Sequence, residues 1–105
     1  MRRISDVKKI TNIPPREVAS IFKQGAILRL PYLEGRLLQA RKNVRNYEQK
    51  YKNTLNQLKT NGLPEDAGYE MHEDFIEWEY WQDVLLENEN IVKHVKELLK
   101  EVEDV

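Results

Sequence analysis

The sequence predicts an all-α protein whose main feature is a long antiparallel helical hairpin of the coiled-coil kind. About thirty residues between Pro31 and Asn61 contain no further proline, and the stretch from Tyr69 to the end contains neither glycine nor proline. Both stretches are rich in Leu, Glu, Lys, Gln and Arg, which favour helix. Residues 61–69 form the one convincing long loop. We therefore expect a hairpin over 30–105 and a short helical segment over 1–29.

Hydrophobic periodicity supports the first long helix, which we expect to begin at Pro31, because proline fits the first turn of a helix. Two heptad rows follow, and eight of their nine residues are apolar, against an overall hydrophobic content of 40%. This excess predicts a helix packed along a narrow seam. The rows are Leu30, Leu37, Val44, Tyr51 and Leu58, and Leu33, Ala40, Tyr47 and Thr54.

The second long helix repeats the pattern, and eight residues of its two rows are apolar. The rows are Met71, Trp78, Leu85, Val92 and Leu99, and Asp74, Trp81, Asn88, Val95 and Val102. A third row, Val84, Ile91 and Leu98, widens the apolar stripe, which is typical of a helix with more than one neighbour. A loop centred near Glu65 predicts antiparallel partners whose numbers add to about 130, such as Tyr51 and Trp78.

Residues 1–29 read as a helix, a tight turn and a second short helix that begins at Pro14 or Pro15 and ends at Gly25. Residues 5–24 resemble the helix-turn-helix of bacterial and archaeal regulators, with Asn12 where glycine is usual in the turn. This resemblance implies DNA contact by the second helix through Arg16, Ser20, Lys23 and Gln24. The alternative is a short helical lid over the open end of the hairpin.

A strong charge asymmetry underlies the net charge of −1. Residues 1–62 carry fourteen basic and four acidic side chains, whereas residues 63–105 carry three basic and fourteen acidic ones. Such a division indicates either an internal pairing of the two halves or separate partners for each. The hairpin favours the first interpretation, because it lays the basic helix along the acidic one.

Seven of the nine aromatic residues gather in residues 69–81 and, opposite them, at Tyr47 and Tyr51. Trp78 and Trp81 belong to the seam, so we expect them in the core. Several other residues are predicted to form an apolar strip with an acidic rim, as protein interfaces do, although the N-terminal lid could cover it instead. The strip is Phe75, Ile76, Tyr80 and Leu86, and the rim is Glu73, Glu77, Glu79 and Asp83.

The stretch from Glu73 to Glu79, preceded by a long basic helix, resembles small helical antitoxins that are encoded beside toxin genes in archaea and some bacteria. The resemblance covers residues 28–103. It implies that the acidic second helix masks a basic, ribonuclease-like toxin, and that the basic N-terminus binds operator DNA. Complementary charge would speed the association.

Several classes of function have no support in the sequence. The absence of cysteine excludes disulfides and thiolate chemistry, and no phosphate loop, nucleophile–histidine pair or Glu-x-x-His motif occurs. We expect a cytoplasmic non-enzyme without cofactor, metal, small-molecule substrate or membrane span, and with no signal peptide. It would act as a homodimer or in a hetero-complex. Protein binding is the leading function; a DNA-binding regulator dimerised by the hairpin and a structural coiled-coil subunit are the alternatives.

Overall fold

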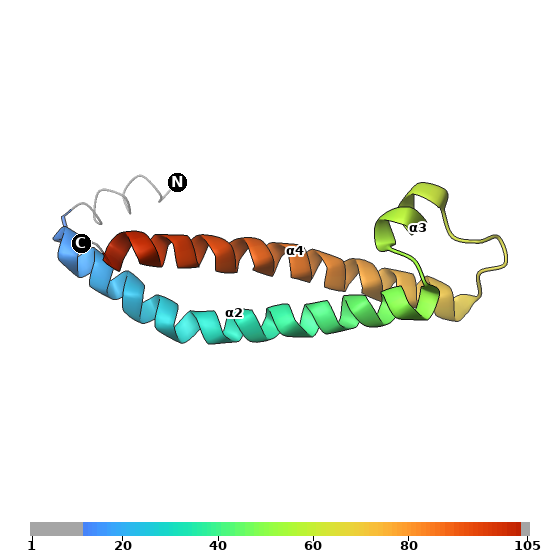
Figure 1. The fold of residues 1–105 in the computed structure, drawn as a ribbon, viewed down its shortest axis with the longest axis horizontal. Coiled ribbons are helices and arrows are strands. Elements are labelled where there is room, and N and C mark those ends of the chain that lie inside the picture. The colour runs from blue at the N-terminus through green and yellow to red at the C-terminus, as the bar shows by residue number, and fades with distance from the viewer. Residues whose placement is uncertain (1–11, 104–105) are drawn as a thin grey trace.

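A computed structural model describes residues 12–103 of the chain, and these residues form helices and no strand. The helices are α2 (Pro15–Tyr51), α3 (Leu55–Asn61) and α4 (Tyr69–Glu103). The two long helices lie side by side and run in opposite directions, while α3 lies at the end where the chain turns (Figure 1). The predicted all-α helical hairpin and its long loop are confirmed.

Cross-helix contacts show the register of the hairpin. The ion pairs Arg41–Glu89 and Glu34–Lys96 join residues whose numbers add to 130, as the loop position predicts. The rings of Tyr51 and Trp78 stack with their centroids 6.0 Å apart. The connection over residues 52–68, which includes α3, therefore sets the pairing of two helices of 37 and 35 residues.

The first long helix begins sixteen residues earlier than expected. It starts at Pro15, with Pro14 as its N-cap, and continues through Gly25 and Pro31 without a break. The expected boundary between a short segment over 1–29 and a hairpin over 30–105 therefore falls inside a helix. The expected short helix ending at Gly25 is wrong because Ala19, Ala26 and Leu33 are buried all along this stretch. That burial offsets the cost of an interior proline, about 3 kcal/mol. Figure 1 shows that α2 bends along its blue-green part.

The same helix also ends earlier than expected, at Tyr51 rather than near Asn61. Lys52 takes the left-handed conformation, with φ of 51°, and the following residues begin a new helix. Thr54 caps α3 by accepting from the backbone N–H of Gln57, whose side chain accepts from the Thr54 N–H in return. This capping box was the overlooked signal, since Thr-x-x-Gln marks a helix start. Thr54, which the heptad pattern assigned to the first long helix, is therefore the N-cap of α3.

The hydrophobic core is concentrated where α3 covers the hairpin. Val44, Leu55, Leu58 and Trp78 form one buried cluster, and Trp78, with 1% of its surface exposed, is the most buried large side chain. Trp81 packs against this cluster but stays half-buried. Asn88 is buried as the heptad predicts, and its side-chain amide donates to the Val84 carbonyl at 2.8 Å. Of the two tryptophans, Trp78 is therefore the central one.

Two expectations on the N-terminal segment lie partly or wholly outside the described residues. The first helix of the helix-turn-helix-like unit and the lid both depend on residues 1–11. None of the helices among residues 12–103 combines the length and hydropathy that crossing a membrane requires.

Candidate protein-binding surface

A cluster of polar groups joins the end of α2 to the start of α4. Lys50 Nζ lies 2.6 Å from Asp74 Oδ2 and 2.9 Å from Glu70 Oε1, and the Tyr51 hydroxyl donates to the same Asp74 oxygen at 2.6 Å. The hydrogen bonds from Lys50 and Tyr51 lower the pKa of Asp74 below its ordinary value. These two carboxylates therefore serve the hairpin itself, because they neutralise Lys50.

Two further tyrosines form hydrogen bonds between α2 and α4. Burial, together with a 2.7 Å hydrogen bond donated to Glu77, raises the pKa of Tyr47 to about 12. Further from the loop, Arg36 donates to the hydroxyl of Tyr80 at 3.3 Å. The guanidinium of Arg36 lies 5.9 Å from the Trp81 ring centroid. Tyr80 also meets Trp81 edge to face, with ring centroids 5.0 Å apart. The ring of Tyr80 is thus held in place on α4 although it is half exposed.

Ion pairs account for much of the charge asymmetry. Four of the five pairs place a basic side chain of the first half against an acid of α4, and the fifth, Lys96–Glu34, is reversed. All of them lie at or near the surface, so each contributes about 0–1 kcal/mol. The internal pairing expected for the two halves is therefore present, and it fixes orientation more than it adds stability.

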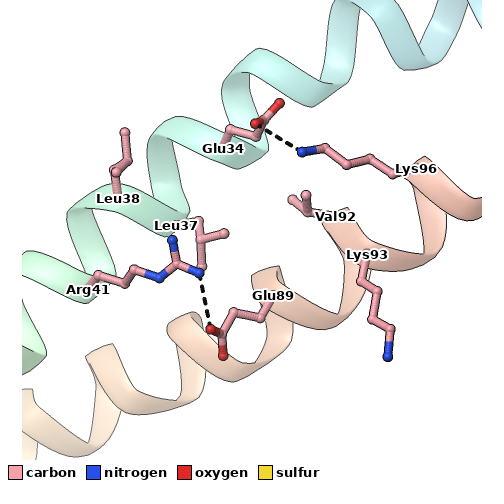
Figure 2. Close-up of a pocket in the computed structure, with 8 residues that line it drawn as sticks. All are labelled: Glu34, Leu37, Leu38, Arg41, Glu89, Val92, Lys93 and Lys96. Carbon is pink, nitrogen blue, oxygen red and sulfur yellow. Dashed lines mark hydrogen bonds and ion pairs between the residues drawn. The ribbon is translucent and has the colours of Figure 1, made fainter.

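A groove on one face of the hairpin shows this pairing most clearly. Figure 2 shows Arg41 reaching Glu89 and Lys96 reaching Glu34 across the two helices, while Leu38 and Lys93 point away from these pairs. Leu37 and Val92 also line the groove, in agreement with the predicted register. Because four of its five charged side chains pair across the helices, we call this the ion-pair face.

The predicted apolar strip with its acidic rim divides into two groups in the structure. Phe75 packs against the buried cluster, Glu77 accepts from Tyr47, and Glu79 lies 3.3 Å from Lys59, so these three side chains serve the fold. Glu73, Ile76, Tyr80, Asp83 and Leu86 are exposed. Leu86 is ten residues from Ile76, which places it about 80° away around the helix.

An outward-facing row on α4 gathers the exposed members of the strip. Its residues follow one another at alternating steps of four and three, so they share one side of the helix, and all of them are exposed. We define the outer row as Tyr69, Glu73, Ile76, Tyr80, Asp83 and Glu87. The sequence analysis missed Tyr69 and Glu87, although the same spacing, counted outward from Ile76, would have found both.

The outer row combines apolar surface with unbalanced negative charge. Ile76 and Tyr80 expose 62% and 52% of their surface. Among the described residues, Glu73, Asp83 and Glu87 form no ion pair. An aromatic and an aliphatic side chain within an acidic border are suited to an interface with a cationic surface.

The residues expected to contact DNA occupy the first turns of α2. Arg16, Ser20 and Lys23 border a hollow that Val102 of α4 closes on its other side, and Gln24 is exposed. These residues belong to a 37-residue helix packed on α4 rather than to a short, separate recognition helix.

No metal centre occurs among the residues that the structure describes, since nowhere do three His, Asp or Glu side chains converge. Comparison of the chain with protein-family models, with curated proteins and with solved structures gave no match.

Proposed function

We propose that this chain is a protein-binding module that uses the outer row of α4 to bind and mask a basic protein. The observation that carries the proposal is the outer row itself: exposed Ile76 and Tyr80 lie between acids that form no ion pair among the described residues. Side chains of this kind supply much of the binding energy in protein interfaces when a partner buries them.

The ion pairs inside the hairpin support the choice of a cationic partner. α4 contains eleven acidic residues and three lysines. The acids that face α2 are largely paired, whereas the three in the outer row face solvent. Their uncompensated field would attract a basic surface over roughly one Debye length, about 8–10 Å at physiological salt. The resemblance to antitoxins gives a class for this partner, a small basic ribonuclease-like toxin.

The experiment uses the product of the gene adjacent to the one encoding this chain. We expect that product to be small and basic, to stop growth when expressed alone, and to be relieved by coexpression of this chain. The double variant Ile76→Glu/Tyr80→Glu should lose both the relief and co-purification, because it places charge in the centre of the interface. The variant Leu38→Glu, which alters an equally exposed leucine on the ion-pair face, is the matched control.

Two results would contradict the proposal. The first is an adjacent gene product that neither binds this chain nor stops growth, while pull-down from the native host retains no basic protein. The second is full relief by the double variant. Binding that survives unchanged in about 1 M salt would contradict the electrostatic part, since the Debye length there is about 3 Å.

A further inference from the structure

The half of the hairpin away from the loop has an apolar groove on the side opposite the ion-pair face. Ile21, Phe22 and Gly25 line it on α2, and Val95 lines it on α4, together with Ala26, Arg29, Leu30 and Leu33. We call it the open-half groove. Its lining is almost wholly apolar apart from Arg29, whose guanidinium lies 4.5 Å from the ring centroid of Tyr32.

The apolar surface extends along both helices from this groove. On α4, Ile91 and Leu98 are four residues before and three after Val95, so they lie on the same side of the helix. These two residues belong to the third apolar row that the sequence shows. On α2, Val18 and Tyr32 stand seven residues on either side of Gly25. Ile21, Tyr32 and Leu98 keep 45–56% of their surface exposed.

Gly25 provides an independent indication of a close neighbour. Glycine in a helix interior costs about 1 kcal/mol relative to alanine, and a Cβ added at Gly25 would meet nothing within 4 Å. There is therefore room for a side chain at this position, and no contact within the described residues explains why the residue is glycine. A bare Cα beside an apolar groove allows another helix to approach closely.

The accessible surface area of the chain is large enough to include an interface with a partner. The accessible surface is 8415 Å² for a mass of 12.5 kDa, whereas a compact monomer of this mass has about 6,200 Å². The difference of about 2,200 Å², taken over all 105 residues, exceeds the roughly 800 Å² that each partner buries in a standard interface. One further helical hairpin against the groove would cover an area of this order.

Charge identifies the neighbour and its orientation. α2 has eight basic and three acidic residues, while α4 is strongly acidic. A second copy placed with its α4 on this α2 sets opposite charges together, chiefly towards the loop, where residues 70–89 hold eight of the eleven acids of α4. Placing α2 on α2 would set like charges together. A two-fold axis along the length of the hairpins gives the first arrangement and brings both loops to the same end.

We infer that a second copy of this chain covers the open-half groove, and that the two hairpins form a four-helix bundle in which α4 of each copy lies along α2 of the other. Such a bundle buries the third apolar row and the Gly25 backbone in a shared core. On α4 the outer row lies beside this interface, because Tyr80 and Leu98 are eighteen residues, or five helical turns, apart. The groove variants at Ile21 and Leu98 leave the side chains of the outer row unchanged, so failure of the bundle and failure of the proposed function are distinguishable.

The primary test is the mass of the full-length chain in solution, measured by sedimentation equilibrium. We expect twice 12.5 kDa for the unaltered protein. Ile21→Glu and Leu98→Glu should each weaken the association by at least about tenfold, because each would bury an unpaired charge. Both side chains are exposed in one copy, so the helical circular dichroism should persist. Leu38→Glu on the ion-pair face is the matched control and should leave the dimer intact.

A second variant guards against loss of folding. Gly25→Gln fills the groove with a bulky polar side chain and at the same time improves helix propensity, so it should give a well-folded monomer. A spin label on Asp66→Cys, in a chain with no native cysteine, should show a distance between loops far shorter than the 62 Å length of the molecule.

Three results would overturn the inference. The first is an unaltered protein that is monomeric at about 100 µM, where an interface of this size is expected to associate. The second is a dimer that Leu38→Glu dissociates and the groove variants do not. The third is a long distance between the two loops, which would place them at opposite ends of the dimer.

Discussion

The two ends of the hairpin use the same pair of helices but are packed differently. Near the loop, α3 adds a third element, and Val44, Leu55, Leu58 and Trp78 form a core with stacked tyrosines around it. Towards the open end, α2 and α4 pack on each other without a third helix among the described residues, and Ile21, Gly25 and Arg29 of the groove remain exposed. Two helices alone cannot enclose a core, because each leaves much of its apolar surface uncovered.

The difference has its origin in side-chain size. Close to the loop, aromatic residues fill the space between the helices, with Tyr47 and Trp78 centroids 5.7 Å apart. In the open half, the buried positions of α2 include Ala19 and Ala26, which contribute little apolar area. We therefore expect the loop half to carry most of the stability of an isolated chain, and the open half to carry its association.

The largest expected effect is that of Trp78→Ala. Truncating a buried tryptophan costs about 3–5 kcal/mol, and we expect a value near the lower end. The indole Nε1–H has no hydrogen-bond partner among the described residues, so its removal relieves an unsatisfied donor. Urea unfolding followed by circular dichroism at low protein concentration measures the loss.

The matched variant in the open half is Leu33→Ala, which truncates a side chain of 7% exposure beside the groove. We expect about 2 kcal/mol here, the low end for leucine, since the side chain has fewer neighbours. Equal losses for the two variants would show that the halves are equally well packed, and would remove the contrast between them.

A gain in stability of up to about 3 kcal/mol is expected for Pro31→Ala. Proline in a helix interior removes one backbone hydrogen bond and crowds the preceding turn, and Pro31 lies sixteen residues into α2. Thermal melting at a fixed protein concentration tests this. A loss of stability would mean that the proline is needed for the packing of the open half on α4.

Periodicity in the sequence predicts the hairpin, its loop and its register, because heptad rows and a Gly/Pro-rich connection are local signals. It does not predict the limits of α2. Pro31 and Gly25 are breakers by local propensity, but burial of Leu33 and Leu37 on α4 outweighs them, and that burial is a tertiary effect.

For the candidate surface, the spacing predicts the exposure of Ile76 and Tyr80. It cannot show that α3 covers Phe75, since that depends on how the chain returns after Lys52. The spacing also cannot show which acids of α4 form ion pairs with basic residues of α2 and α3. Glu79 and Glu73 are alike in sequence, yet only Glu79 comes within reach of Lys59 on α3.

The smallest expected effect concerns pH and is confined to the loop half. Asp74→Asn removes the charge that Lys50 and Tyr51 stabilise, and we expect a loss of about 1–2 kcal/mol at pH 7 after allowance for solvent screening. The folded pKa of Asp74 is lowered. Its stabilisation is therefore complete above its unfolded value of about 3.9 and is lost as the pH falls through the folded value.

The difference in unfolding free energy between the unaltered protein and Asp74→Asn should thus stay constant from pH 7 to about 5 and then shrink towards pH 2. Glu73→Gln, one residue away on the outer row, should show no such difference, because Glu73 has no ion pair among the described residues. If both variants gave the same pH profile, the acid sensitivity would come from the overall negative charge of α4. The Lys50–Asp74–Tyr51 network would then not be what distinguishes the loop half from the open half.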